Sequence, residues 1–263
     1  AIVLLTITFT CVLVSPVTRV LFFAAAAALC AYEFSKNVEK LEARCTLWVM
    51  FVYIAAQAAL VILQDVYAVF DTGMLAYCVL FVFCIYLALF SGVIHKQVSG
   101  KGALFTLAGL TYPCVLFGAI MVISVSRIWA FTLILACLST WVCDSFAMFG
   151  GKWFGKHKVA PLVSPNKTVE GCVTGAVSSL FVGLIVYFIF KDHTLSVWLC
   201  MGTAFLASTM GQIGDLAESL LKRMIGVKDF SNLIPGHGGM FDRADSLLFS
   251  IPTAYLCLFL ANI

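Results

Sequence analysis

Residues 74–94 read MLAYCVLFVFCIYLALFSGVI, an apolar run of 21 residues without a charged side chain. A transmembrane helix needs about 20 mainly apolar residues, because each residue advances the helix by about 1.5 Å through a hydrocarbon layer about 30 Å thick. This run therefore predicts a helix that spans a membrane.

The rest of the chain has the same character. Of its 263 residues, 62% are hydrophobic and 11% are charged, whereas about 25% of the residues of an ordinary soluble domain are charged. So much apolar surface must face lipid, so we expect an all-α, polytopic integral membrane protein. The 11 cysteines contain no CxxC pair or zinc-binding spacing. Because most of them lie in apolar runs, we interpret them as packing residues.

Polar clusters divide the chain into apolar runs long enough to span a membrane. These runs cover residues 1–14, 18–34, 45–63, 74–94, 103–123, 128–149, 172–190, 195–221 and 246–263. We expect about nine transmembrane helices in one domain over residues 1–263, since no linker or internal repeat divides the chain. The first run begins at Ala1 without a methionine, which leaves open whether an N-terminal piece is missing.

The positions of the basic residues predict the orientation in the membrane. Thirteen of the 16 Lys and Arg residues follow the second, fourth, sixth or eighth run, and the other three are Arg19, Arg127 and Lys191. Lys and Arg are enriched in cytoplasmic loops. We therefore expect a cytoplasmic N-terminus, with the long polar connections 150–171 and 222–245 on the cytoplasmic side.

The most polar part of the chain is residues 215–246, which read DLAESLLKRMIGVKDFSNLIPGHGGMFDRADS. On helices, a spacing of three places Asp215 with Glu218, and Asp242 with Asp245, on one side. Carboxylates at a membrane are costly without a cation. Each of them could pair with a nearby Lys or Arg, but their number beside a glycine-rich turn favours a divalent metal. Hard oxygen ligands of this kind suit Mg²⁺.

Two further features suggest a site for phosphate groups. Gly236, Gly238 and Gly239 allow a sharp turn whose amides can point at an anion. In the other long connection, Asp144 ends an apolar helix, and Lys167 stands at the start of the next helix, where free amides commonly hold polyphosphates. The neighbouring residues Lys152, Lys156 and Lys158 can also be explained as topology signals.

These motifs resemble those of the phosphatidate cytidylyltransferase family, also called CDP-diacylglycerol synthases. The resemblance covers residues 139–250 and includes the segment SPNKTVEG. The family's tail signature is matched by Ser219, Lys222, Arg223, Lys228, Asp229, Pro235, His237, Gly238, Gly239, Asp242, Arg243 and Asp245. The chain departs from the family pattern at Ala244, Phe146 and Met148, which concerns local packing.

The resemblance implies transfer of the cytidylyl group of CTP to phosphatidic acid, with Mg²⁺ as cofactor, a second metal ion left open, and a homodimeric assembly. Carried onto this sequence, the metal ligands are sought among Asp215, Asp242 and Asp245, with Asp144 and Glu218 as further candidates. The catalytic candidates are Lys167, Asp215, Asp242 and His237. The substrate-binding candidates are Lys152, Lys156, Ser219, Lys222, Arg223, Lys228, Gly238, Gly239 and Arg243.

The expected setting is an active site that faces the cytoplasm, in the inner membrane of a bacterium or in the endoplasmic reticulum or an organelle membrane of a eukaryote. We expect CTP to arrive from the cytoplasm and the lipid to enter laterally, beside the eighth and ninth runs, past small residues such as Gly211. No nucleic-acid partner is expected. A CTP-dependent enzyme acting on another lipid, such as a polyprenol kinase, and an ion-coupled transporter are the alternatives.

Overall fold

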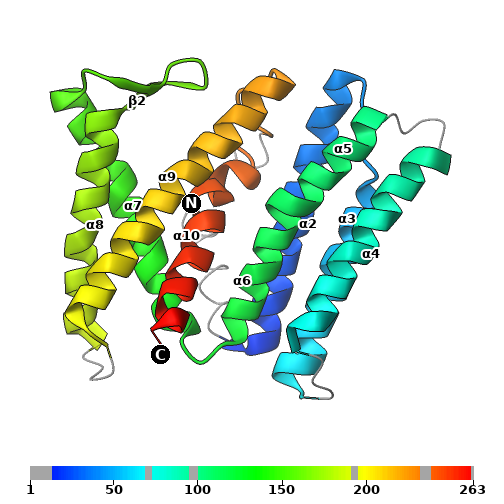
Figure 1. The fold of residues 1–263 in the computed structure, drawn as a ribbon, viewed down its shortest axis with the longest axis horizontal. Helices are drawn as coiled ribbons and strands as arrows, with labels where there is room; N and C mark the ends of the chain where they lie inside the picture. Colours follow the sequence, from blue (N-terminus) through cyan, green and yellow to red (C-terminus); the bar gives the residue numbers. More distant parts are fainter. Residues whose placement is uncertain (1–13, 69–72, 95–99, 191–194, 232–237, 262–263) are drawn as a thin grey trace. The chain divides into compact units, whose positions relative to one another are not determined.

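A computed structural model describes residues 14–68, 73–94, 100–190, 195–231 and 238–261 (Figure 1). Contacts within the chain group it into two compact units. The first unit comprises residues 1–127 and 229–242, and the second comprises residues 128–228 and 243–263. The expectation of one transmembrane domain stays a prediction.

The first unit is built from helices. They are α2 (Pro16–Val38), α3 (Leu47–Leu60), α4 (Gly73–Ile94), α5 (Gly100–Gly109) and α6 (Val115–Val125), with a 3₁₀ turn at Glu39–Leu41 and π turns at Val61–Val66 and Leu110–Cys114. Helix α2 packs against α3 and α6. It begins at a capping box, in which Ser15 and Thr18 accept each other's backbone N–H, followed by Pro16 in the first turn.

Arg19 is a buried basic residue near the start of α2. Its side chain is only 6% exposed, and its Nε donates to the carbonyl oxygen of Ser124, 2.9 Å away in the last turn of α6. Carbonyl groups at a helix C-terminus lack intrahelical partners and attract positive charge. One of the three basic residues on the expected outer side therefore has a structural role in joining α2 to α6.

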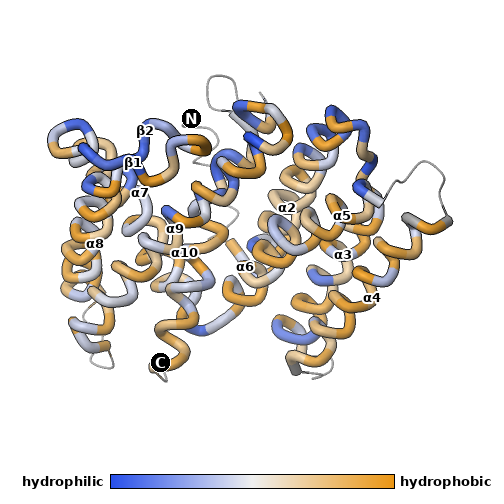
Figure 2. The backbone as a smooth tube through the Cα atoms, turned by 45° about the horizontal axis from the view of Figure 1, so that its top comes forward, coloured by the Kyte–Doolittle hydropathy of each residue, from blue (hydrophilic) through white to orange (hydrophobic). Residues whose placement is uncertain are grey.

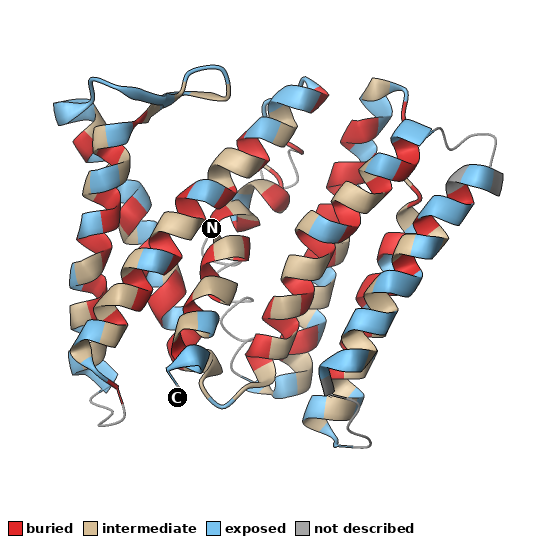
Figure 3. Ribbon diagram, viewed as in Figure 1, coloured by how far each residue is buried: buried red, intermediate tan, exposed pale blue. Residues whose placement is uncertain are grey.

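Helices α5 and α6 form one continuous span, Gly100–Val125. The π turn between them contains Pro113, which has no N–H to donate and so disrupts the regular ladder of helix hydrogen bonds. Helix α4 is mostly exposed. Only 17% of its apolar segment Met74–Ser91 is buried, and Figure 3 shows the helix largely exposed. Its outward-facing apolar side chains include Leu75, Phe83 and Phe90, as expected of a helix that faces lipid.

The second unit contains helices and one small sheet. Its elements are α7 (Trp129–Phe154), β1 (Lys158–Ala160), β2 (Ser164–Thr168), α8 (Val169–Phe190), α9 (Val197–Ile225) and α10 (Phe241–Leu260), the last of which begins in the first unit. Helix α8 packs against both α7 and α9. A buried cluster joins these helices to α10 and contains Phe131, Leu135, Val182, Val186, Leu195, Cys200, Ala204 and Leu258.

The helical membrane architecture is confirmed, and seven described helices are long and apolar enough to span a membrane. The eight described helical stretches coincide with eight of the nine predicted runs, whereas residues 1–13 of the first run lie outside the described residues. Helix α9 is absent from the seven; its first half contains several Gly, Ser and Thr residues, and its second half carries Asp215, Glu218, Lys222 and Arg223. Several ends differ by up to five residues, and α10 begins at Phe241 instead of residue 246.

The connection 150–171 contains an antiparallel β-hairpin that the sequence analysis did not predict. Strands β1 and β2 pair Lys158 with Thr168 and Ala160 with Ser164. A turn closes the hairpin, with Val163 N donating to Ala160 O at 3.1 Å and Pro161 between them, a position that favours proline. The hairpin is hydrophilic, in contrast to the mainly apolar helices (Figure 2). It delivers Lys167, on β2, to the start of α8.

Candidate active site

Three carboxylates of the second unit lie close together. Asp215 and Glu218 come from α9, and Asp245 comes from α10. Each offers an oxygen within 4.8 Å of an oxygen of the other two. The helical spacing of three residues places Asp215 and Glu218 on one side of α9, as predicted. We call this group the carboxylate cluster.

The close approach of α10 to α9 at this point depends on Gly214. A Cβ atom at Gly214 would lie 2.6 Å from the backbone oxygen of Asp245 and 2.7 Å from the ring of Phe249. Any larger residue would therefore force the two helices apart. The missing side chain allows Asp245 to reach the two carboxylates of α9.

Lys167 forms an ion pair with the carboxylate cluster. Its Nζ lies 2.6 Å from Asp215 Oδ2, and it lies 3.5 Å from the backbone oxygen of Gln212. The two side chains of the pair are 22% and 30% exposed, so a ligand can still reach them. Ser219 adds a longer hydrogen bond, donating to Asp215 Oδ1 at 3.4 Å. Lys167, Asp215 and Ser219, three of the predicted site residues, are thus brought together.

Glu218 is the most buried member of the cluster. Its side chain is fully buried, and Oε2 lies 2.5 Å from Lys222 Nζ, one helical turn further along α9. We therefore interpret Glu218 primarily as the ion-pair partner of Lys222 and only secondarily as a metal ligand. Asp215 and Asp245 are each only partly buried, so they are better placed to bind an incoming cation.

The hairpin that carries Lys167 is fixed by two contacts that the sequence analysis missed. Glu170 accepts hydrogen bonds from the backbone N–H groups of Lys156 and His157, at 3.0 and 3.2 Å, and lies 2.6 Å from His157 Nδ1. At the other end, Arg223 Nε donates to the carbonyl oxygen of Val163, at 3.1 Å. Arg223 joins the end of α9 to the hairpin turn, and its predicted role in substrate binding stays a prediction.

The remaining candidates of the second unit lie outside the carboxylate cluster. Asp144 was expected to end its helix, but α7 continues to Phe154. Asp144 interacts electrostatically with Asp215 and Lys167. It is exposed and, among the described residues, lies outside the group of three carboxylates. Several basic candidates are exposed side chains, namely Lys152, Lys156, Lys228 and Arg243. Their exposure leaves them available to anions.

Asp242, Gly238 and Gly239 belong to the first unit. Asp242 Oδ2 accepts the backbone N–H of Gly239 at 2.8 Å and that of Phe230 at 3.0 Å. In the described part of the chain this carboxylate thus organises the start of α10, and it was not predicted to do so. His237 lies outside the described residues.

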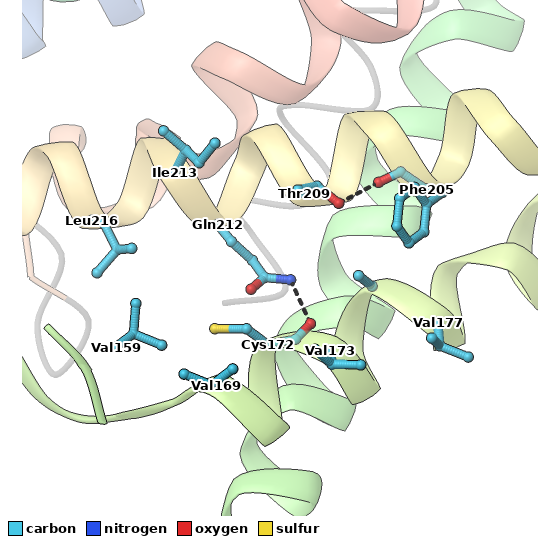
Figure 4. A pocket seen from close by; sticks show the side chains of 11 residues that line it. Val159, Val169, Cys172, Val173, Val177, Phe205, Thr209, Gln212, Ile213 and Leu216 are labelled. Carbon is cyan, nitrogen blue, oxygen red and sulfur yellow. Dashed lines mark hydrogen bonds between the residues drawn. The ribbon is translucent and has the colours of Figure 1, made fainter. Parts of the chain in front are cut away.

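An apolar groove runs along the second unit between α8 and α9. Figure 4 shows Val169, Val173 and Val177 of α8 opposite Phe205, Thr209 and Ile213 of α9. Its volume is about 470 Å³. In its middle part lies Gln212, whose amide donates to Cys172 O at 3.2 Å and whose own backbone oxygen accepts from Lys167. Gln212 thus connects the groove to Lys167, the partner of Asp215.

Gly211, which we expected to border the path of a lipid, is packed between α9, α7 and α10. It is buried, and a Cβ there would lie 3.3 Å from Thr140 Cγ2 of α7 and 3.4 Å from the backbone oxygen of Ser246 of α10. It does not line the groove. A large residue at this position would test helix packing, so Val173 and Thr209 are better probes of lipid access.

The cluster has the chemistry that a divalent metal requires. Three carboxylates in contact repel one another, and the two lysines Lys167 and Lys222 offset only two of the three negative charges. Mg²⁺ prefers hard oxygen ligands and is usually bound by one or two carboxylates together with substrate phosphates. Asp215 and Asp245 would supply those carboxylates, and Lys167 would stand beside the phosphates.

The chain is similar to known cytidylyltransferases. Residues 1–261 match the cytidylyltransferase family. A phosphatidate cytidylyltransferase of Staphylococcus aureus is 45% identical over 123 residues, which are 47% of each chain. Proteins of the same name from Staphylococcus saprophyticus and Staphylococcus epidermidis are 44% and 41% identical over 126 residues, or 48% of each chain. The matching segment thus spans about half the length of these curated relatives.

We expect Asp245→Asn and Asp215→Asn each to weaken metal binding at least about tenfold, since even the outer partners of metal ligands typically contribute that much. Titration with Mn²⁺, followed by electron paramagnetic resonance, measures the affinity without requiring turnover. Glu39→Gln, which neutralises an exposed carboxylate in the first unit, is the matched control. Unchanged affinity in both aspartate variants would show that the cluster holds only ion pairs.

Proposed function

The chain belongs to the cytidylyltransferase family, and on this premise we propose that it transfers the cytidylyl group of CTP to phosphatidic acid. The products are CDP-diacylglycerol and pyrophosphate. The observation that carries the proposal is the Lys167–Asp215 pair, which stands beside two further carboxylates and contacts Gln212, a lining residue of the apolar groove. This combination suits a reaction between a polyphosphate and a lipid.

The reaction exchanges one phosphorus–oxygen bond for another. An oxygen of the phosphatidate phosphate bonds to the α-phosphorus of CTP, while the bond from that phosphorus to the oxygen bridging to the β-phosphorus breaks. Its electron pair leaves with pyrophosphate. Because the second pKa of a phosphomonoester is about 6, much of the nucleophile is already dianionic at neutral pH. The reaction therefore needs no strong general base, and His237 is proposed to shape or position the site.

The main obstacle is repulsion between two anions. Lys167 would bind a phosphate oxygen and stabilise the charge that develops on the leaving group. Its ion pair with Asp215 holds the ammonium group in place before substrate arrives. A divalent metal, when bound by Asp215 and Asp245, supplies further positive charge to the phosphates. Lys152, Lys156, Lys222, Lys228 and Arg243 are proposed to attract the nucleotide to this end of the second unit.

The groove between α8 and α9 is proposed to hold an acyl chain of the lipid. Leaving a chain in water costs about 0.8 kcal/mol for each exposed CH₂ group, so the chain must stay in an apolar environment during the reaction. The valines of α8 provide that environment, and the ammonium group of Lys167, which contacts Gln212, complements a phosphate headgroup. CTP would approach from the polar side, along the hairpin.

The remaining parts of the proposal rest on the sequence. The metal is proposed to be Mg²⁺, with Asp242 available to a second ion. The assembly would be a homodimer, as the family resemblance implies, and the predicted run 1–14 lies almost wholly outside the described residues. The active site would face the cytoplasm, in the inner membrane of a bacterium or in the endoplasmic reticulum or an organelle membrane of a eukaryote.

The direct test is incubation of the purified protein with labelled CTP, Mg²⁺ and phosphatidate, followed by identification of the products. We expect CDP-diacylglycerol and pyrophosphate in equal amounts. In Lys167→Ala, the CTP concentration at half-maximal rate should rise at least about tenfold, because a hydrogen bond to a charged group contributes about 1.5–3 kcal/mol. Lys101→Ala, which removes an exposed lysine of the first unit, serves as the control.

The same assay separates the alternatives. A polyprenol kinase would release CDP and phosphorylate a polyprenol, and an ion-coupled transporter would consume no CTP. Either result in place of pyrophosphate release would refute the proposed reaction. An unaltered CTP dependence in Lys167→Ala would reassign this lysine to a purely structural ion pair.

The proposed orientation has its own test. In a cysteine-free background that retains activity, a cysteine replacing Lys158 should react with an impermeant maleimide only from the cytoplasmic side. A cysteine replacing Arg127 should react only from the opposite side, because the positive charges are biased toward the cytoplasm. Both positions are exposed in the structure. Labelling of both from one side would contradict this topology.

Filling the groove should affect the lipid substrate selectively. We expect Val173→Trp to raise the concentration of long-chain phosphatidate needed for half-maximal rate, because the indole would occupy the space proposed for an acyl chain. The CTP dependence should stay close to that of the wild type. Ile185→Trp, at an exposed position of the same helix outside the groove, is the control. Equal effects of the two variants, or an effect on CTP alone, would contradict a lipid site here.

A further inference from the structure

Glu33 is a buried carboxylate in the half of the chain that carries no recognisable motif. It lies on α2 within a helix apolar enough to span a membrane, and its side chain is 4% exposed. A carboxylate in such a place is costly unless donors surround it. The identity of its donors therefore indicates what the residue is for.

The donors of Glu33 come from the segment around the start of α10. Its Oε1 accepts from Ser231 Oγ at 2.5 Å and from the backbone N–H of Met240 at 3.0 Å. Its Oε2 accepts from the backbone N–H of Phe241 at 2.9 Å. The first N–H groups of a helix have no partner within the helix, and negative charge is favoured near them. Glu33 thus caps α10 from a residue more than two hundred positions earlier.

Asn37, one turn further along α2, holds the other side of this segment. Its Nδ2 donates to the carbonyl oxygen of Phe230 at 2.5 Å and to that of Glu33 at 2.8 Å. Lys40 Nζ donates to Asn37 Oδ1 at 2.8 Å, which fixes the orientation of the amide. Since the N–H of Phe230 donates to Asp242 Oδ2, Phe230 is held through its carbonyl by α2 and through its amide by Asp242.

Packing excludes any loose arrangement of these groups. The rings of Phe230 and Phe241 are 4.8 Å apart, and that of Phe34, from α2, lies 6.3 and 6.5 Å from them. A Cβ atom at Gly239 would lie 2.7 Å from Glu33 Oε2, so only glycine allows the backbone to approach the carboxylate this closely. The glycine of the signature is thus explained by a partner on α2.

We infer that Glu33 and Asn37 are positioning residues for the signature at the start of α10. They fix Phe230, Gly239 and the first turn of α10, and through them the carboxylate of Asp242. The role assigned to Asp242 rests on the proposed function. Asp245 follows one turn later on the same helix. Stability alone does not explain this choice, because apolar side chains of similar size often stabilise a buried site as well as charged ones.

The experiment compares Glu33→Gln and Asn37→Leu with Ser35→Ala, which changes a buried polar residue on the same helix that interacts with Cys45 instead. Hydrogen exchange, read by mass spectrometry on a peptide covering residues 238–245, reports the anchoring without any substrate. Turnover and its Mg²⁺ dependence are measured on the same samples, together with thermal unfolding.

We expect exchange in this peptide to accelerate about tenfold or more in Glu33→Gln and Asn37→Leu, because each change removes a hydrogen bond that closes the segment. Turnover should fall about tenfold or more, and more Mg²⁺ should be needed for half-maximal rate. Ser35→Ala should match the wild type in all three. If Glu33→Gln fails to fold, Asn37→Leu leaves the carboxylate in place and carries the same test.

The outcomes separate this inference from the proposed function. Wild-type exchange rates in both variants would overturn the inference whatever the reaction is. Faster exchange with unchanged turnover and Mg²⁺ dependence would overturn the positioning role, since the segment would then be anchored for another reason. A wild-type protein that makes no CDP-diacylglycerol, while the variants still accelerate exchange, would refute the proposed reaction and leave the anchoring in place.

Discussion

A carboxylate among apolar helices must lie beside a cation or a hydrogen-bond donor, and this requirement organises both units of the protein. In the first unit, Glu33 meets the requirement with backbone amides and a hydroxyl. In the second unit, Glu218 meets it with Lys222, and Asp215 with Lys167. The Glu33 and Asp215 contacts each join segments that are far apart in the sequence. The contacts that stabilise a buried carboxylate also fix the positions of the groups that make them.

Carboxylates paired with backbone amides and those paired with lysines differ in how easily they can exchange partners. Backbone amides cannot leave when a competing ion arrives, so Glu33 is suited to a permanent structural role. A lysine ammonium on a flexible side chain can move, and the Lys167–Asp215 pair is partly exposed. An incoming cation could take the place of the ammonium group, which would then be free to contact a phosphate. This difference separates the residues that shape the site from those that exchange partners during a reaction.

The architecture could be read from the sequence because lipid imposes a simple rule on composition. Runs of about 20 apolar residues predict spanning helices, and eight of the predicted runs coincide with the described helices. Residues at three- and four-residue spacing on α9 were correctly assigned to one face. The hairpin was missed because both strands are short and have few alternating apolar residues, and because β2 contains Pro165. The periodicity of the sequence therefore did not indicate a strand.

The candidate site was only partly predictable, for a related reason. The predicted carboxylates Asp215, Glu218 and Asp245 are adjacent in the structure. They could be found in the sequence because several carboxylates at helical spacing form a recognisable pattern. Glu33 gave no such signal, because a single acidic residue in an apolar helix does not indicate its partner, and its donors are about 200 residues away in sequence. A sequence reader could have noted only that a carboxylate in an apolar helix needs an explanation.

The discontinuity of the first unit affects how the protein is made. Residues 1–127 leave the ribosome first, but the donors of Glu33 belong to residues 229–242, which complete that unit. Residues 128–228 have to be synthesised in between, and at about 5–20 residues per second this takes on the order of ten seconds. During this interval, the α2 carboxylate is already in the chain without its final partners. Water, a proton or an assisting protein has to stabilise it there, so this glutamate is a point at which membrane insertion and late folding are linked.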